Sequence, residues 1–176
     1  MKRKIQRIFF HLFKYFIGLL AYVNSRLYMK FYNSFLKSSG ITLNGVPRFI
    51  AKSAKFDDFN LIALGDRLVV SSNVIFLTHD YSFTTGLIAI DEKPKTDIGI
   101  LGPISIGNNV FIGMNSILLP GTTIGNNVIV GAGSVLRGKI PDNVVVSGNP
   151  AIVVSDIESH IEKLKVKNYT RRVDKK

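Results

Sequence analysis

A six-residue period runs through most of this 176-residue chain and restricts what it can fold into. Aliphatic residues recur at every sixth position: Ile106, Ile112, Leu118, Ile124, Val130 and Leu136. Four residues after each stands a small or β-branched side chain: Val110, Ser116, Thr122, Val128, Ser134 and Ile140. A period of six fits neither a helix nor a simple alternating strand. It predicts short straight segments separated by corners, three of which make one 18-residue triangular coil.

The coil itself also repeats. Residues 104–121 and 122–139 are identical at eight of eighteen positions. Two pairs of asparagines stand eighteen residues apart, and we interpret them as corner residues and not as ligands: Asn108 with Asn126, and Asn109 with Asn127. The six-residue step continues upstream through Leu64, Val70 and Phe76, and, after a two-residue slip, through Ile50 and Phe56.

The formal charge of +11 is concentrated in the first third of the chain. Residues 1–56 hold eleven basic side chains and no acidic one, together with eight of the twelve Phe and four of the six Tyr. The rest of the chain carries no net charge, so the chain consists of a neutral body and a basic, aromatic N-terminal segment. The chain has no cysteine, which excludes disulfides and thiolate chemistry.

Residues 1–39 are predicted to form a basic, amphipathic helical segment. The apolar run 8–23 is short for a membrane span, contains Lys14, and is followed by no convincing signal-peptide cleavage site. One stripe is apolar, and the opposite side is polar: Ile5, Ile8, Phe9, Leu12, Phe13, Phe16, Ile17 and Leu20 against Lys4, Arg7, His11, Lys14 and Gly18. A second helix is expected over 26–37, with a polar stripe opposite an apolar one: Arg26, Lys30, Asn33 and Lys37 against Leu27, Phe31 and Phe35.

Two interpretations of this segment remain open. Such helices suit the interface of an anionic membrane, and they equally suit docking on the protein body or on a partner subunit. Nucleic-acid binding is disfavoured, because the aromatic residues form an apolar stripe and do not alternate with the basic ones. Since the coil begins near Gly40, removal of residues 1–38 is expected to leave it folded.

Three features together resemble one known family: the hexads, a lone histidine before a long loop, and a Gly-Asn-Pro-Ala exit. The histidine stands in Phe76-Leu77-Thr78-His79-Asp80, the loop covers 80–103, and the exit ends at Gly148-Asn149-Pro150-Ala151. The pattern is similar to the hexapeptide-repeat acetyltransferases of the galactoside, maltose and Nod-factor type and of polysaccharide clusters. The resemblance implies an all-β fold, a left-handed parallel β-helix over 40–154, with a short C-terminal helix in 155–176.

The implied reaction is transfer of an acetyl group from acetyl-CoA to a sugar hydroxyl of a surface glycan or its precursor, without a metal. Imidazole titrates near neutrality and can take the hydroxyl proton, and His79 is the one histidine of the coil region. Asp80 could orient this imidazole or contact the acceptor. Asp58 and Asn60 align with a stretch that contacts the acceptor sugar in the galactoside enzymes. We expect His11 to belong to the basic stripe and His160 to be solvated.

In the resembled family, coenzyme A lies in a groove between subunits of a homotrimer. Carried over, the groove would be lined by Met114, Gly131, Ala132, Arg137, Lys139 and Pro150. Phe111 stands where many relatives have Trp, and Ile152 stands where relatives place a basic residue near the coenzyme phosphates. Arg137 and Lys139, or Arg171 and Arg172, could supply that charge.

Other activities fit the same scaffold. An N-acetyltransferase of an amino-sugar nucleotide would use the same histidine, and a purely structural solenoid would bind no coenzyme A. A γ-type carbonic anhydrase needs three histidine ligands for each zinc, which one histidine in the coil cannot provide. The acceptor implies a cytoplasmic protein. The membrane interpretation of residues 1–38 would place it peripherally at the inner face of the cytoplasmic membrane, and nucleic acid is not expected as a partner.

Overall fold

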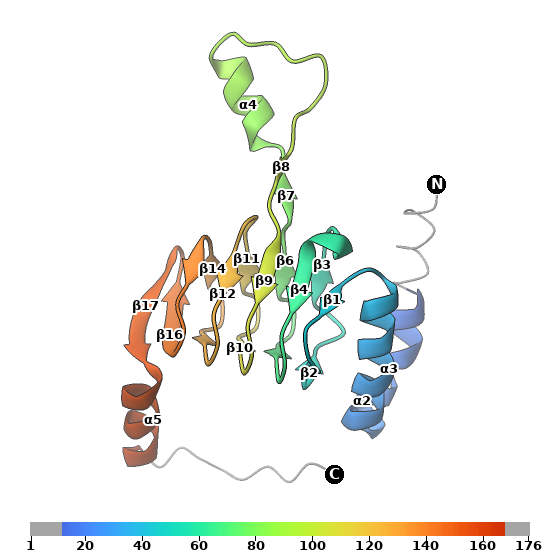
Figure 1. The fold of residues 1–176 in the computed structure, drawn as a ribbon, viewed down its shortest axis with the longest axis vertical. Coiled ribbons are helices and arrows are strands. Elements are labelled where there is room, and N and C mark those ends of the chain that lie inside the picture. The colour runs from blue at the N-terminus through green and yellow to red at the C-terminus, as the bar shows by residue number, and fades with distance from the viewer. Residues whose placement is uncertain (1–11, 168–176) are drawn as a thin grey trace.

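The computed structural model describes residues 12–167, and its centre is a three-walled parallel β-helix (Figure 1). Wall A consists of β1 (Thr42–Leu43), β4 (Ile62–Leu64), β9 (Ile104–Ile106), β12 (Thr123–Ile124) and β15 (Lys139–Ile140). Wall B consists of β2 (Phe49–Ile50), β5 (Val69–Val70), β10 (Phe111–Ile112), β13 (Ile129–Val130) and β16 (Val144–Gly148). Wall C consists of β3 (Lys55–Phe56), β6 (Ile75–Phe76), β11 (Ile117–Leu118) and β14 (Val135–Leu136). The triangular coil predicted from the six-residue period is therefore confirmed.

The inward side chains are those that the period singled out. Ile112, Leu118, Val130 and Leu136 are fully buried, and the small residues Ser116, Thr122 and Ser134 are fully buried near the corners. Ser116 and Ser134 donate their hydroxyl hydrogens to the Gly113 and Gly131 carbonyls, at 2.8 and 2.6 Å. The small position of each hexad thus satisfies corner carbonyls that would otherwise be buried without a partner.

The corner between walls A and B confirms the corner role of the asparagines. Asn109, Asn127 and Asn143 have φ of 54°, 54° and 60°, in the left-handed region that asparagine tolerates. Their side chains form a ladder, with Nδ2 to Oδ1 distances of 2.9 Å between 109 and 127 and 2.8 Å between 127 and 143. Gly107 precedes this corner, and a Cβ there would lie 2.5 Å from the Gly125 carbonyl oxygen. Successive coils therefore approach too closely there for a side chain.

The two-residue slip in the period has a structural cause. The 3₁₀ turn η1 (Phe59–Leu61) lies between β3 and β4 and accounts for the extra residues. After β6 the coil is interrupted a second time. The strands β7 (His79–Asp80) and β8 (Ile100–Leu101) form an antiparallel ribbon that leads to α4 (Ser82–Ala89). This arm projects away from the coil (Figure 1).

Helices cover the N-terminal end of the coil. Residues 12–17 are helical, and α2 (Leu20–Val23) and α3 (Ser25–Ser38) follow, with the Asn24 side chain capping α3 through Leu27 N at 2.9 Å. The second predicted helix is thus confirmed, and Arg26, Lys30 and Lys37 of its polar stripe are exposed, but its apolar stripe is wrong at two of three positions. Leu27 and Phe31 are exposed, and α3 buries Tyr28, Met29, Tyr32, Phe35 and Leu36.

The buried face of α3 takes the place of a further coil. The hydroxyl of Tyr28 donates to the Ile50 carbonyl at 2.8 Å, and Ile50 N donates to the Met29 sulfur at 3.2 Å. Ile50 lies on β2, the edge strand of wall B, so these side chains pair an edge that would otherwise be open. Tyr32 and Leu36 join the same apolar cluster as the first coil. Because α3 contributes to the core of the first coil, folding of the coil without residues 1–38 stays a prediction.

The first helical stretch docks with a face that is rotated from the predicted apolar stripe. Phe13, Ile17 and Leu20 of that stripe do pack on the core. Lys14 and Gly18, expected on the polar side, are buried, whereas Leu12 and Phe16 are exposed. The reason is again the open end of the coil, because the ammonium group of Lys14 donates to the Ala54 carbonyl. The predicted stripe positions 4, 5, 7, 8, 9 and 11 lie outside the described residues. Within residues 12–167, no helix is long and apolar enough to cross a bilayer.

The C-terminal end of the coil is closed by a hairpin and a helix. The strand β17 (Ala151–Asp156) runs antiparallel to β16, and α5 (Ile157–Val166) follows, as expected for the tail. Asp156 caps α5 by accepting a hydrogen bond from Ser159 N at 2.8 Å.

Candidate active site

The register of wall C brings Asp58 and His79 to the same corner. β3 pairs with β6 so that Phe56 lies opposite Phe76, and their rings stack with centroids 4.7 Å apart. Asp58 follows Phe56 by two residues, and His79 follows Phe76 by three. Both breaks in the six-residue period therefore occur at one place, the corner between walls C and A on two successive coils.

The imidazole of His79 is held by a carboxylate. Its Nδ1 lies 2.7 Å from Oδ2 of Asp58 and 4.0 Å from Oδ2 of Asp57. Thr78 fixes Asp58 in turn, because its hydroxyl donates to Asp58 Oδ2 at 3.0 Å and accepts from Asp58 N at 3.0 Å. An ionised carboxylate only accepts hydrogen bonds, so Nδ1 carries the hydrogen and Nε2 presents its lone pair. This arrangement is that of an oriented general base.

The pair is accessible but partly shielded. The side chains of His79 and Asp58 are 28% and 24% exposed, so a substrate can reach the imidazole while much of the bulk water is kept away. The ring of Tyr81 meets the imidazole edge-on, with centroids 5.7 Å apart. The pairing of His79 with Leu101 in the β7–β8 ribbon fixes the backbone at this point. The site is thus built by the root of the arm.

The other predicted acceptor residues are placed differently. Asp80 does not orient the imidazole, since its Oδ1 accepts from Ser82 N at 3.0 Å and from the Ser82 hydroxyl at 2.5 Å. These hydrogen bonds hold the pKa of Asp80 below its ordinary value. Asn60 is exposed on η1, beside the corner. Asp58 contacts the histidine, and its contact with the acceptor stays a prediction.

The residues predicted to line the coenzyme groove fall on both corners that border wall C. Met114, Gly131 and Ala132 lie at the corner between walls B and C, where Gly133 N donates to the Met114 carbonyl at 2.8 Å. Arg137 lies at the corner between walls C and A, the same corner as His79. Lys139 opens β15 just beyond it, and Pro150 lies in the turn between β16 and β17. Within one chain, strands β11 and β14 separate the two groups.

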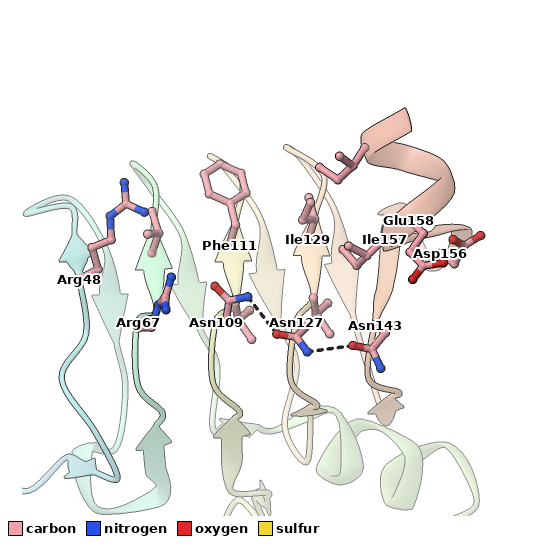
Figure 2. A pocket seen from close by; sticks show the side chains of 14 residues that line it. Arg48, Arg67, Asn109, Phe111, Asn127, Ile129, Asn143, Asp156, Ile157 and Glu158 are labelled. Carbon is pink, nitrogen blue, oxygen red and sulfur yellow. Dashed lines mark hydrogen bonds between the residues drawn. The ribbon is translucent and has the colours of Figure 1, made fainter. Parts of the chain in front are cut away.

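A groove of about 780 Å³ lies on a different wall from His79. Its floor is the outer face of wall B, and α5 borders it (Figure 2). Val69, Phe111 and Ile129 form the apolar floor. Arg48 and Arg67 lie toward one end, and Asp156 and Glu158 toward the other (Figure 2). The outer face of wall B is therefore apolar in the middle and oppositely charged at its ends.

His160 is half-buried on α5, far along the chain from the corner, and His11 lies outside the described residues. Within residues 12–167, no group of three His, Cys, Asp or Glu side chains could hold a metal ion.

The sequence did not reveal Asp58 as the partner of His79. The available signal was that the two interruptions of the six-residue period follow Phe56 and Phe76, which occupy equivalent positions of successive coils. Residues at equivalent interruptions must be neighbours in a coil. The two-residue slip in the six-residue period hides the length of the first coil, so the sequence does not show that these two interruptions are equivalent.

Comparison with known proteins agrees with the β-helix fold. The family described as bacterial transferase hexapeptide (six repeats) matches residues 103–138. Protein CapG of Staphylococcus aureus is 41% identical over 142 residues, which are 79% of this chain and 80% of CapG. WbbJ of Escherichia coli K12 is named as a lipopolysaccharide biosynthesis O-acetyl transferase. It is 30% identical over 76% of this chain and 74% of its own length.

Relatives that are named for a sugar acceptor match over a smaller share of their length. The galactoside O-acetyltransferase of Escherichia coli K12 is 36% identical over 65% of this chain, and the match spans 57% of that enzyme. Among solved structures, a maltose O-acetyltransferase from Clostridium difficile 630 is 27% identical, with a TM-score of 0.54 over 71% of this chain and 74% of that one. A galactoside acetyltransferase in complex with coenzyme A has the same fold, with a TM-score of 0.54 over 82% and 76% of the two chains at 24% identity.

Proposed function

The chain belongs to the hexapeptide-repeat acetyltransferases, and on this premise we propose that it transfers the acetyl group of acetyl-CoA to a hydroxyl of a surface-glycan sugar or of its precursor. The observation that carries the proposal is the 2.7 Å contact between His79 Nδ1 and Asp58, which leaves Nε2 as the base. The names of the relatives WbbJ and galactoside O-acetyltransferase support a sugar hydroxyl as the acceptor.

The geometry accounts for a direct transfer. Nε2 of His79 takes the proton of the acceptor hydroxyl as its oxygen attacks the thioester carbonyl carbon. The tetrahedral intermediate then collapses, the carbon–sulfur bond breaks, and the proton passes to the leaving coenzyme A sulfur. Asp58 holds the ring in place and stabilises the imidazolium that forms between these steps. The chain has no cysteine, and an acetyl-enzyme is not needed.

We propose a homotrimer with its acetyl-CoA clefts between protomers. The outer faces of the three walls support this arrangement. Wall A is mostly polar outside, with Thr42, Ala63, Ser105, Thr123 and Lys139. Walls B and C present mainly apolar rows, which are Phe49, Val69, Phe111 and Ile129, and Lys55, Ile75, Ile117 and Val135. A cleft between two protomers can combine the corner of Met114 and Ala132 from one with the corner of His79 and Arg137 from the next.

The proposed acceptor also bears on where in the cell the protein acts. If the acceptor is carried on lipid at the inner face of the cytoplasmic membrane, the exposed basic residues Arg26, Lys30 and Lys37 favour a peripheral position there. The enzyme then acts on the cytoplasmic side.

The test is an acetyl-CoA turnover assay that measures release of the free thiol. We expect turnover with glycan or simple sugar acceptors that carry hydroxyl groups. The control acceptors are UDP-amino sugars, and turnover with these alone would replace the proposal by N-acetylation. Thermal unfolding with and without acetyl-CoA separates a poor acceptor from an absent activity, because a bound ligand must raise the unfolding temperature. A structural solenoid would give no shift.

A further inference from the structure

One apolar stripe on the N-terminal helices is left exposed after the helices have docked on the coil. It consists of Leu12, Tyr15, Phe16, Leu19, Tyr22 and Val23, all exposed large apolar or aromatic side chains, and we call it the outer stripe. The positions follow steps of three and four, which place the side chains along one face of a helical segment. Tyr15, Tyr22 and Val23 are 75%, 78% and 83% exposed.

The packing of the protein does not explain the outer stripe. The opposite face already provides the contacts with the core, through Phe13, Ile17, Leu20 and Ala21. Single exposed apolar residues are ordinary, but six along one face form a contiguous apolar surface. Such surfaces mark contacts with another protein or with a membrane. Leu27 and Phe31 add exposed apolar area on α3.

The charges around the outer stripe distinguish a membrane from a second copy of the protein as its binding partner. Residues 1–56 contain no acidic side chain, and Arg26, Lys30, Lys37 and Lys52 are exposed among the described ones. Lys52 even lies against the stripe, with its ammonium nitrogen 4.8 Å from the centre of the Tyr22 ring. Two copies that met through this surface would oppose like charges, which is unfavourable. An anionic lipid surface complements both the charge and the apolar side chains.

The position of the outer stripe agrees with this occupant. The helices cover the N-terminal end of the coil (Figure 1), and Asp58 and His79 lie on its first two coils. Successive coils rise by only about 4.8 Å, so the candidate active site lies near the helix-covered end. In a cyclic trimer, three copies of the stripe stand at the same height along the symmetry axis and can meet one surface together.

We infer that the outer stripe, Leu12 to Val23, inserts its apolar side chains into the interface of an anionic bilayer while the surrounding lysines and arginines meet the lipid phosphates. The advantage of docking rests on the proposed function, since it brings His79 to lipid-carried acceptors. The docking surface itself does not depend on that function, and its test is therefore separate from turnover.

The first experiment is flotation of the full chain with vesicles of phosphatidylglycerol and phosphatidylcholine. The variant Phe16→Gln/Leu19→Gln removes two stripe side chains without changing charge, and Val154→Gln/Val166→Gln removes two exposed apolar side chains elsewhere. We expect the stripe variant to lose at least about tenfold in vesicle binding, because apolar burial drives insertion. The control variant should bind as the parent does, and both should acetylate a water-soluble sugar at the parental rate.

The second experiment uses fluorescence, since the chain contains no tryptophan. In Phe16→Trp the single indole should shift its emission to shorter wavelength when anionic vesicles are added, whereas in Val166→Trp it should not. Equal flotation of parent and stripe variant, or no shift for Phe16→Trp, would overturn the inference. So would a change of molecular mass in Phe16→Gln/Leu19→Gln with vesicle binding intact, because the stripe would then contact protein. If turnover is absent but the stripe still inserts, the proposed function fails and the docking surface stands.

Discussion

Nδ1 of His79 and Oδ2 of Asp58 lie 2.7 Å apart and join two successive coils of the β-helix. Neither residue belongs to the regular six-residue repeat, and each follows a stacked phenylalanine of wall C. The regular coils therefore act as a rigid frame, and the two places where the chain leaves that frame provide the chemistry. This relationship leads to predictions about catalysis, and the docking of the helices leads to others about stability.

Replacing His79 with alanine should abolish most of the activity without disturbing the fold. A positioned base contributes roughly 10²–10⁴-fold to turnover, and we expect a loss within that range. Turnover, thermal unfolding and the acetyl-CoA-induced shift are measured together. His160→Ala is the matched control, since His160 lies on α5. Parental turnover in a folded His79→Ala protein would remove His79 from the mechanism.

Replacing Asp58 with asparagine should lower kcat by roughly 10²-fold, because an amide can orient the ring wrongly and does not stabilise the imidazolium. The KM for acetyl-CoA should change little, since Asp58 acts through the imidazole. The matched control is Asp57→Asn, whose Oδ2 is 4.0 Å from Nδ1 in the parent. An equal loss of kcat in both variants would argue against a specific role for Asp58.

The two tyrosines beneath the coil should respond in opposite ways to loss of their hydroxyl groups. Tyr28 donates to the Ile50 carbonyl at 2.8 Å, so Tyr28→Phe should lower the free energy of unfolding by about 1 kcal/mol. The buried hydroxyl of Tyr32 has no hydrogen-bond partner among the described residues, so Tyr32→Phe should be neutral or stabilising by up to about 1 kcal/mol. Denaturant titration of both variants compares them directly. A larger loss for Tyr32→Phe would contradict the packing.

The buried Lys14 should make stability rise with pH above neutrality. Burial, together with the charge of Lys55, lowers the pKa of Lys14 from 10.5 to about 8. Between these values the unfolded chain binds more protons than the folded one, so the free energy of unfolding increases with pH. Above pH 10 the effect reverses, because burial raises the pKa values of Tyr28 and Tyr32 and their ionisation favours unfolding.

For Lys14, the free energy of unfolding is measured by denaturant titration at pH 7.5 and at pH 9.5. In this interval the effect of Lys14 is present, and the opposite effect of the tyrosines has not yet begun. The free energy of unfolding of the parent should be higher at pH 9.5 than at pH 7.5, by on the order of 1–3 kcal/mol. Lys14→Met should lose that gain, because methionine fills similar space and carries no proton. Equal pH dependence in parent and variant would show that folding does not lower the pKa of Lys14.

A charge placed on wall B should break the proposed trimer. Phe111 is an exposed aromatic residue on the outer face of this wall, next to Val69 and Ile129. In Phe111→Arg, assembly would bury an unpaired charge, and we expect light scattering to give the mass of a monomer. Thr123→Arg places the same charge on the polar wall A and should leave the mass unchanged. A trimer in both variants would move the interface away from wall B.

The sequence by itself determined the coil and the place of the histidine. The hexads must bury one residue in six on the axis, and Ile112, Leu118, Val130 and Leu136 do so without exception. A repeat of this kind depends only on contacts between equivalent positions of neighbouring coils, so the period of the sequence determines the register of the strands. The position of His79 at an interruption of that period could be read in the same way.

Only the tertiary structure decided which partner His79 has and which faces the helices bury. The slip near η1 hid the register of the first coil, so the sequence could not place Asp58 opposite Thr78 and His79. The docked face of the first helical stretch combines Ile17 of the predicted apolar stripe with Lys14 and Gly18 of the predicted polar side, and periodicity alone could not predict this choice. The choice came from the open end of the coil, where the carbonyls of Ile50 and Ala54 required donors that Tyr28 and Lys14 provide.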